Sequence, residues 1–299
     1  MNYAFSSALK VLYTNLMCFI CFTFGYPFAK KLDAYIRFKR RLNLNHPESL
    51  ADKVSYLELF EVQGLKITCT DKYACREYVK QKGFTDILIP VYTKALTSFE
   101  QLNFNKLPQT FVIKATHGCR MNLVVHDKNS LDLETTQKEI QTWLSTTYGL
   151  ASIEPHYRCL EHRFYVEKYM GSNLFDYKIH CLNGEPEFIL VCSNRESKKG
   201  APTKVDLDVF DIKWNKIDCL VPFGNECPGK GEIEKPKHLD MMLSIARKLA
   251  EEFKFVRVDL YEIEDKVYFG ELTFSPATCV FPYLSERFLK QMGKKLDIT

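Results

Sequence analysis

The chain has 299 residues, of which 46% are hydrophobic and 26% charged, and its formal net charge is +4. These values are typical of a globular protein with one large or two smaller domains, and the charge balance gives no indication of nucleic-acid binding. The 11 cysteines are scattered without paired metal-site spacing, which favours free thiols in a reducing, cytoplasmic compartment over a disulfide framework.

The first unusual segment is the mostly apolar stretch 11–29, which a basic run up to Arg41 follows directly. A membrane-spanning helix needs about 20 apolar residues, and interruptions such as Asn15 and Pro27 make this stretch marginal for one. An interfacial helix with a basic flank would instead dock on an anionic cytoplasmic leaflet. We expect residues 1–41 to dock in this way, with a spanning helix and a buried core helix as the alternatives.

Residues 42–105 are expected to form an N-terminal α/β subdomain. Ser49 is a suitable N-cap for a helix over 50–60, and a second helix is predicted from Asp71 to Lys82. The apolar run 87–92 predicts a buried strand.

Residues 106–175 are expected to form a central subdomain. The strand Thr110 to Lys114 leads into a short loop whose glycine, Gly118, would let the backbone wrap phosphates. The polar segment 131–147 predicts a helix, and 163–170 predicts a strand.

Residues 176–299 are expected to form the C-terminal subdomain. A strand over 177–182 ends in the turn 183–186, and a helix over 236–253 precedes a hairpin over 256–276. No internal repeat is present.

Two acids, Asp259 and Glu271, interrupt the apolar strands of this hairpin, which an acidic turn over 262–266 would close. Folding the hairpin brings both carboxylates to the same end. Mg²⁺ prefers hard oxygen ligands and is commonly bound by one or two carboxylates together with substrate phosphates. Ordinary surface acids, or an ion pair with Arg257, are the alternatives that the spacing leaves open.

A magnesium site of this kind implies a nucleotide and cationic residues near its phosphates. Lys114 and Lys178 both lie within predicted strands, where a lysine that faces a cleft is a compact donor to phosphate oxygens. An edge-strand lysine whose amine reaches solvent is the alternative for each. Arg195 follows another strand and would suit a transferring phosphoryl group.

The order of these motifs resembles the ATP-grasp superfamily, and in particular its TupA-like branch. The strings that carry the resemblance are LPQTFVIKATHG, DYKIHCLNGEP, FVRVDLY and YFGELTFSP, and it extends over roughly residues 40–295. It implies an α+β fold of the ATP-grasp type, in which two α+β subdomains clasp a nucleotide, preceded by the apolar and basic N-terminal helical segment.

The resemblance also implies a role for each candidate site residue. The residues implied to bind ATP are two phosphate-binding lysines, the glycine loop, an adenine-contacting hinge and an acid for the ribose: Lys114, Lys178, Gly118, Glu167, Lys168, Tyr169, Met170 and Asp176. The implied magnesium ligands are Asp259, Glu271 and Thr273, and Thr273 stands where the family usually has asparagine. Arg195 and Arg257 are implied to flank an acyl phosphate. Gly118 is a single glycine where the family often has two.

The implied chemistry is carboxylate activation by ATP. The acid becomes an acyl phosphate, an amine attacks its carbonyl and phosphate leaves, so the protein supplies alignment and charge neutralisation rather than a nucleophile. The TupA-like branch resembles enzymes proposed to join amino acids to uronic acids of cell-surface polysaccharides, which implies a glycan acid and an amine as substrates. The alternatives are a kinase that phosphorylates a glycan hydroxyl and a nucleotide-binding scaffold weakened at Thr273.

Overall fold

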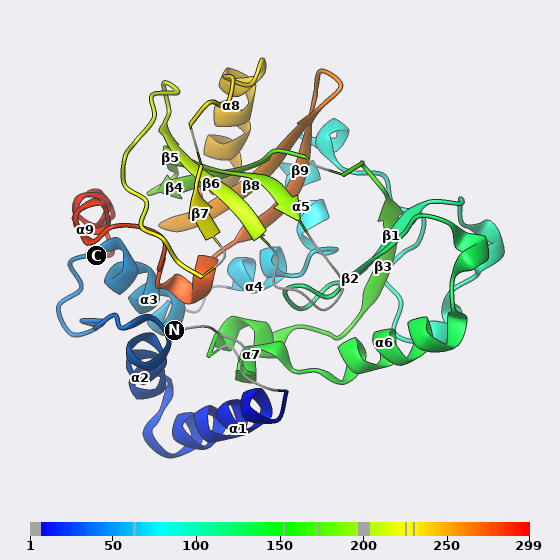
Figure 1. Ribbon diagram of the computed structural model, residues 1–299, viewed down its shortest axis with the longest axis horizontal. Helices are drawn as coiled ribbons and strands as arrows, with labels where there is room; N and C mark the ends of the chain where they lie inside the picture. The colour runs from blue at the N-terminus through cyan, green and yellow to red at the C-terminus, as the bar shows by residue number, and fades with distance from the viewer. Residues whose placement is uncertain are drawn as a thin grey trace.

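The computed structural model describes residues 7–61, 64–151, 153–172, 174–196, 204–224, 226–229 and 231–299. The larger of two sheets has six strands in the spatial order β7 (Glu226–Pro228), β6 (Lys204–Asp211), β5 (Glu185–Glu196), β4 (Asp176–Leu182), β8 (Phe255–Ile263) and β9 (Lys266–Thr273). The smaller sheet has three strands in the order β2 (Asn122–Val125), β1 (Phe111–Ala115) and β3 (Phe164–Lys168). Figure 1 shows the larger sheet on the left of the molecule and the smaller sheet to its right.

Helices surround both sheets (Figure 1). They are α1 Ser7–Phe24, α2 Tyr26–Phe38, α3 Leu50–Phe60, α4 Gly64–Thr70, α5 Cys75–Gln81, α6 Leu133–Ser145, α7 Tyr148–Ala151, α8 Leu239–Ala250 and α9 Glu286–Lys295. Every neighbouring strand pair is antiparallel except β6 and β7. The mixture of helices with largely antiparallel sheets is an α+β architecture.

The larger sheet carries a hydrophobic core on each face, because side chains of a strand alternate between the two faces. One core joins residues of β4 and β8, such as Ile179 and Val258, to α8. The other joins β5 and β6 to α3 and α9, and it includes Leu190. Lys178 is the register partner of Leu190, so it lies on the α3 and α9 face. That face therefore carries both a core and the charged residues of the candidate site.

Two hairpins of the larger sheet turn on a pair of residues with positive φ. Asn183 and Gly184, between β4 and β5, have φ of 52° and 82°, and Glu264 and Asp265, between β8 and β9, have 47° and 61°. Left-handed conformation at both central residues is the signature of the two-residue type I′ turn, which matches strand twist. The predicted acidic turn at 262–266 is therefore present but shorter than expected.

The helix predicted to start after Ser49 is confirmed, since Ser49 and Asp52 form a capping box at the start of α3. The predicted second helix starts at Cys75 and not at Asp71. The Asp71 carboxylate accepts hydrogen bonds of 2.8 Å from two backbone amides that follow it, which stabilises a turn before the helix.

The strand predicted at 87–92 is wrong. Residues Thr85–Ile87 form a 3₁₀ turn, and Leu88 and Val91 each make a single bridge, to β9 and β3 respectively. Pro90 has no backbone N–H to donate to a ladder, so the run does not become a strand, and only its first half, residues 87–89, is buried.

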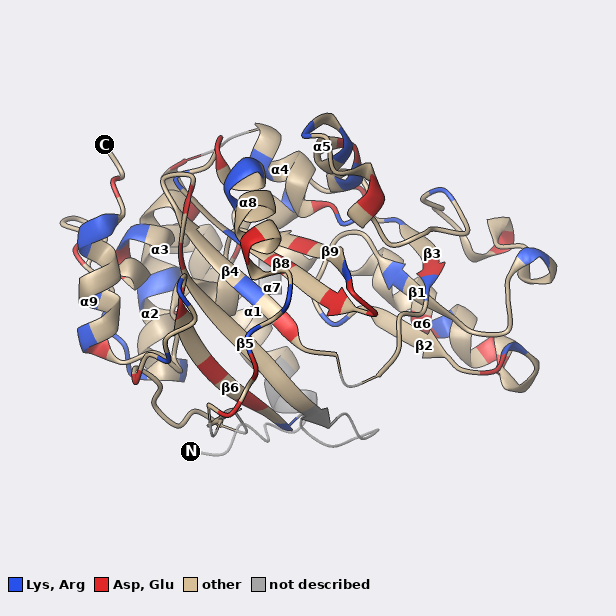
Figure 2. Cartoon of the chain, turned by 90° about the horizontal axis from the view of Figure 1, so that it is seen from above, with Lys and Arg blue, Asp and Glu red and all other residues tan. Residues whose placement is uncertain are grey.

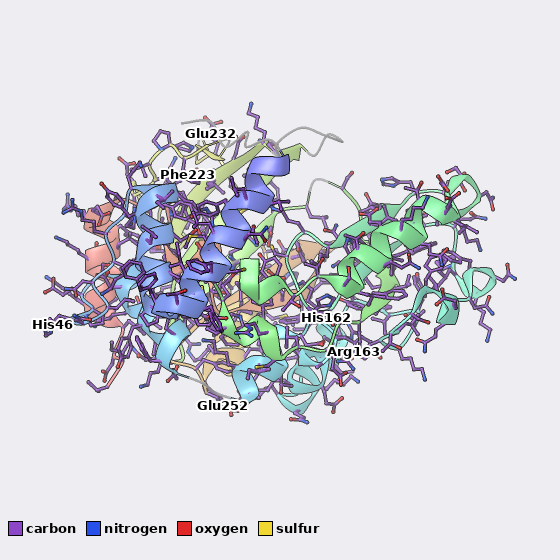
Figure 3. The ribbon with its side chains drawn as sticks, turned by 90° about the horizontal axis from the view of Figure 1, so that it is seen from below. His46, His162, Arg163, Phe223, Glu232 and Glu252 are labelled. Atoms are coloured by element: carbon purple, nitrogen blue, oxygen red, sulfur yellow. The ribbon has the colours of Figure 1, made fainter. Side chains whose placement is uncertain are left out.

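The apolar N-terminal stretch forms two helices and not one. Gly25, with φ of 81°, separates α1 from α2, a conformation that glycine adopts without steric cost. None of the helices that the structure describes is both long enough and apolar enough to span a membrane. In Figure 3, which views the molecule from below, α1 and α2 lie in front of the larger sheet.

A buried ion cluster joins α3 to α4 and to the segment after α7. Glu58 is 3% exposed, and its carboxylate lies 3.0 Å from Lys66 Nζ and 2.5 Å from His156 Nδ1. Burial alone would raise the pKa of Glu58, but the hydrogen bond from His156 and the charge of Lys66 outweigh it and hold the pKa at about 2.

We expect Glu58 to make the fold sensitive to acid. Because its folded pKa lies below the ordinary value of 4.5, its stabilisation is fully present above that pH and is lost as the pH falls toward 2. A shift of this size corresponds to about 3 kcal/mol at neutral pH. Urea unfolding at several pH values should show that Glu58→Gln lowers stability at pH 7 and flattens the acid limb. Glu77→Gln, at an exposed position, serves as the control, and an unchanged acid limb in Glu58→Gln would contradict the assignment.

Candidate functional site

Three adjacent strands bring the central site residues into one row. The sheet register places Lys178 of β4 opposite Asp259 of β8, and Asp259 opposite Glu271 of β9. Arg257 stands opposite Thr273 in the same hairpin. Figure 2 shows acidic and basic positions side by side on β4, β8 and β9. The predicted meeting of the two hairpin carboxylates is confirmed.

A β-bulge at Gly270 turns Glu271 toward Asp259. The register of β8 and β9 shifts between Asp259 and Leu260, which pair with Glu271 and Phe269, so Gly270 has no partner. Without the extra residue, Glu271 would share the α8 face with Phe269, because side chains two apart lie on one face. A Cβ at position 270 would stand 2.9 Å from the Tyr261 ring and 3.1 Å from the Asp259 carbonyl oxygen, so only glycine fits without a shift.

Asp259 is the centre of a buried network of ion pairs. Arg257 donates to both of its carboxylate oxygens, from Nε to Oδ1 at 2.6 Å and from Nη2 to Oδ2 at 2.7 Å. Lys178 Nζ lies 2.5 Å from Asp259 Oδ2 and 2.7 Å from Asp176 Oδ2. Asp259 is only 1% exposed, and a carboxylate buried to this degree needs such partners.

The surrounding charges keep Lys178, Arg257 and Glu271 ionised. Burial would lower the pKa of Lys178, but Asp176 and Asp259 raise it above the ordinary lysine value. Burial opposes the charge of Arg257 as well, and Asp259 again raises the pKa. Burial would raise the pKa of Glu271, yet it is lowered, chiefly by the charge of Lys72. The site therefore presents fixed positive and negative charges at neutral pH.

Thr273 holds the second hairpin carboxylate in place. Its hydroxyl donates to Glu271 Oε1 at 2.9 Å and accepts from Arg257 Nη2 at 3.0 Å. Arg257 Nη2 also lies 3.3 Å from Glu271 Oε1. The Glu271 side chain is 35% exposed, so this carboxylate, unlike that of Asp259, faces solvent.

Lys72 belongs to the site and was missed from the sequence. Its ammonium donates to the carbonyl oxygen of Gly118 and lies 4.0 Å from Glu271 Oε2, so it connects the glycine loop to the hairpin. Arg163 fixes the turn before it by pairing with Asp71 at 3.0 Å. The sequence did contain one indication of this role. A lysine at the start of a predicted helix is disfavoured by the helix dipole, so its ammonium is expected to bind an acceptor outside the helix.

The smaller sheet supplies the other predicted nucleotide contacts. Lys114 on β1 forms an ion pair with Glu167 on β3, and the lysine is 31% exposed while the glutamate is 5% exposed. The loop after Lys114 is tight at Gly118, where a Cβ would stand 2.8 Å from Met121 Sδ. Lys168 is exposed, and Tyr169 and Met170 after it are half-buried.

Three predicted roles have no direct counterpart in these contacts. Asp176, expected at the ribose, is buried and pairs with Lys178. Thr273, expected at the metal, binds Glu271 and Arg257. The side chain of Arg195 lies outside the described residues. These roles stay predictions.

The chemistry of the two hairpin acids is compatible with a magnesium ion that would also bind phosphate oxygens. Among the described residues, no group of three histidine, cysteine, aspartate or glutamate side chains could enclose a metal. Mg²⁺ does not require such a group, because one or two carboxylates with substrate phosphates and water complete its shell. Asp259 and Glu271 would supply the carboxylates; Asp259 Oδ2 already accepts from Arg257 and Lys178, whereas Oδ1 accepts from Arg257 and can accept a second interaction. Lys72, Lys178 and Arg257 supply positive charge beside them.

Comparison of the sequence with protein-family models gives one match. The sequence matches the model of the family described as TupA-like ATPgrasp over residues 52–296. No curated protein matches it.

Similar solved structures include D-alanine–D-alanine ligase from Bacillus anthracis complexed with ATP, at 17% identity and a TM-score of 0.42, covering 69% of this chain and 55% of that one. Another is the biotin carboxylase domain of Hydrogenobacter thermophilus 2-oxoglutarate carboxylase in complex with MgADP, at 14% identity and a TM-score of 0.43, covering 75% of this chain and 46% of that one. The chain therefore spans about half the length of these solved proteins.

Proposed function

Because the chain belongs to the TupA-like ATP-grasp family, we propose that it is an ATP- and Mg²⁺-dependent carboxylate-amine ligase. The family match confirms the resemblance and the α+β ATP-grasp fold predicted from the sequence. The observation that carries the proposal is the row formed by Lys178, Asp259 and Glu271, with Arg257 beside it. Such a row binds and aligns phosphates and needs no nucleophile of its own.

The residues of the row divide between metal and phosphate. Asp259 and Glu271 would hold Mg²⁺, with Thr273 orienting Glu271. The ion, when bound, would neutralise negative charge on the transferring phosphoryl group. Lys178 and Arg257 would contact the phosphates of ATP and of the acyl phosphate. Ion pairs already hold both side chains in place, so they need to move little as negative charge develops on the transferring phosphoryl group.

The two sheets would hold the nucleotide between them. Lys114 and the Gly118 loop would cover the phosphates, and Lys72 connects that loop to Glu271. The backbone of residues 167–170 would receive adenine, Asp176 the ribose hydroxyls, and Arg195 the acyl phosphate. The subdomain boundaries near residues 42, 106 and 176 remain part of this proposal.

For substrates we propose the carboxylate of a uronic acid in a cell-surface polysaccharide or its precursor, and the amine of an amino acid. The support is the family to which the chain belongs. We also propose that the enzyme works in the cytoplasm as a peripheral protein on the membrane face, where a lipid-linked glycan precursor would be accessible.

The assay that tests this function requires both acceptors. With ATP and Mg²⁺, we expect phosphate release only when a uronic acid and an amino acid are both present, because the amine must attack the acyl phosphate to complete turnover. Mass spectrometry should then find an amide. Phosphate transfer to a glycan hydroxyl would instead identify a kinase. Tight ATP binding without turnover across acceptor mixtures would identify a scaffold.

A further inference from the structure

The outer side of α1 is covered with apolar side chains that the fold does not bury. Leu12, Leu16 and Phe19 follow at intervals of four and three residues, which places them on one helix face. Phe19 is 62% exposed and Phe22 is 92% exposed. Single exposed hydrophobic residues are ordinary, but a continuous stripe marks a surface that binds something.

The opposite side of α1 already provides the packing that holds the helix to the protein. Met17 and Ile20 are buried together with Ala29 of α2 and with Ile153. The outer stripe is therefore not needed for the fold of the chain.

The stripe continues onto α2. The rings of Phe24 and Phe28 lie 5.3 Å apart across the Gly25 break, and Tyr35, two turns further along α2, is 46% exposed. The two helices together present one apolar surface, which we call the α1–α2 outer face. Figure 3 shows both helices on the side of the molecule that faces the viewer.

The charge around this face is mainly positive. Residues 7–45 contain seven lysine and arginine residues, of which Lys30 is buried and Arg40 pairs with Glu286, and a single acid, Asp33. That acid is 3% exposed, accepts a hydrogen bond from Tyr13 at 2.7 Å and pairs with Arg37 at 3.4 Å. A second copy of the chain docked through this face would bring like charges together, whereas an anionic surface would complement them.

A groove between α2 and the segment that follows it combines exposed apolar side chains with positive charge. Its volume is about 430 Å³, and its lining includes Phe28, Lys31, Tyr35 and Arg41. The Arg41 guanidinium lies 5.8 Å from the centre of the Tyr35 ring. Two cations beside exposed aromatic rings are suited to a phosphate group attached to an apolar tail.

We propose that the α1–α2 outer face docks on a bilayer containing anionic lipids, and that this groove binds a lipid phosphate headgroup. The helices would lie along the interface, with Phe19, Phe22 and Phe28 at the boundary between headgroups and acyl chains. The proposal deepens the membrane location given under the proposed function and rests on it for its biological purpose. Its physical basis is independent of the ligase chemistry.

Vesicle flotation tests the surface with the full-length protein. We expect it to float with vesicles of phosphatidylcholine mixed with phosphatidylglycerol, and to float poorly with phosphatidylcholine alone. Lys31→Glu combined with Arg41→Glu should weaken binding by at least about tenfold, since each basic residue near an anionic surface adds to the attraction. Phe19→Ser combined with Phe22→Ser should weaken binding to the same vesicles through loss of apolar burial.

Matched controls separate this surface from general charge and hydrophobicity. Lys138→Glu and Leu133→Ser alter exposed residues of α6, on the other part of the molecule, and should float like the unmodified protein. Equal binding to both vesicle types, or equal losses in the control variants, would overturn the proposal. If the protein instead forms dimers without lipid, and the Phe19 and Phe22 substitutions dissociate them, the face binds a second copy of the chain.

Ligase turnover with soluble acceptors distinguishes failure of this proposal from failure of the proposed function. Neither pair of variants touches the ATP site, so each should retain the turnover of the unmodified protein. Flotation without ligase activity would leave the docking surface intact and reject the chemistry. Ligase activity without flotation would support the chemistry and reject the docking surface.

Discussion

Replacing Asp259 by asparagine is expected to abolish ATP-dependent turnover. The side chain keeps its size but loses the charge that would hold Mg²⁺ and that now holds Arg257 and Lys178. Removing one group that stabilises charge in a transition state typically lowers kcat by roughly 10²–10³-fold, and here one change removes a proposed metal ligand that is also the partner of two cations. Initial rates over a range of Mg²⁺ and ATP concentrations would measure the loss.

Asp265→Asn is the matched control, because it makes the same change in the same hairpin at an exposed turn residue. It should leave turnover unchanged. Asp259→Asn also leaves two buried cations short of a partner, so its thermal unfolding must be compared with that of the unmodified protein. Folded Asp259→Asn protein with normal Mg²⁺-dependent turnover would show that the hairpin is not the metal site.

Lys178→Met is expected to impair both ATP binding and stability. The lysine amine lies between Asp176 and Asp259, so its removal leaves two buried carboxylates facing each other with less compensation. Removing one partner of a buried ion pair lowers the free energy of unfolding by about 3 kcal/mol or more. Loss of a charged contact to phosphate should also raise KM for ATP by about tenfold to a hundredfold. Urea unfolding and steady-state kinetics measure the two effects separately.

A second substitution tests whether the loss at Lys178 comes from the fold alone. Asp176→Asn in the Lys178→Met background removes one of the two facing carboxylates and should recover part of the stability, but its affinity for ATP should stay below that of Asp176→Asn alone, the reference needed because Asp176 is itself assigned to the ribose. Lys248→Met, at an exposed position of α8, should change neither quantity. Recovery of ATP binding along with stability would mean that Lys178 has a purely structural role.

Local signals predicted those elements whose ends are set by nearby residues. The helix after Ser49 and the polar helix near 131–147 were found because caps and periodicity depend on close neighbours in sequence. The strand at 87–92 was not, since an apolar run indicates burial but does not reveal whether neighbouring strands form a ladder. The N-terminal stretch divides at Gly25, whose positive φ breaks the helix, and residues of both resulting helices are buried together with Ile153, a contact far apart in the sequence.

The residues of the candidate site also fall into those that local sequence predicts and those that depend on contacts between distant segments. Asp259 and Glu271 could be paired from the sequence because a hairpin turn lies between them. Lys72 could not, because its contacts with Gly118 and Glu271 join segments far apart in the chain. The ion pairs of Asp259 were foreseen only as an alternative to metal binding, although a carboxylate can serve cations and a metal through different lone pairs.

The bulge at Gly270 makes the length of β9 as important as its composition. Deleting one residue there would restore strict alternation, and Glu271 would then point into the apolar layer beneath α8 and away from Asp259. Any strand change that preserves every site residue but alters this spacing would separate the two carboxylates. For related sequences, the interval between the two acids is therefore a criterion for an intact site, alongside the identity of the acids themselves.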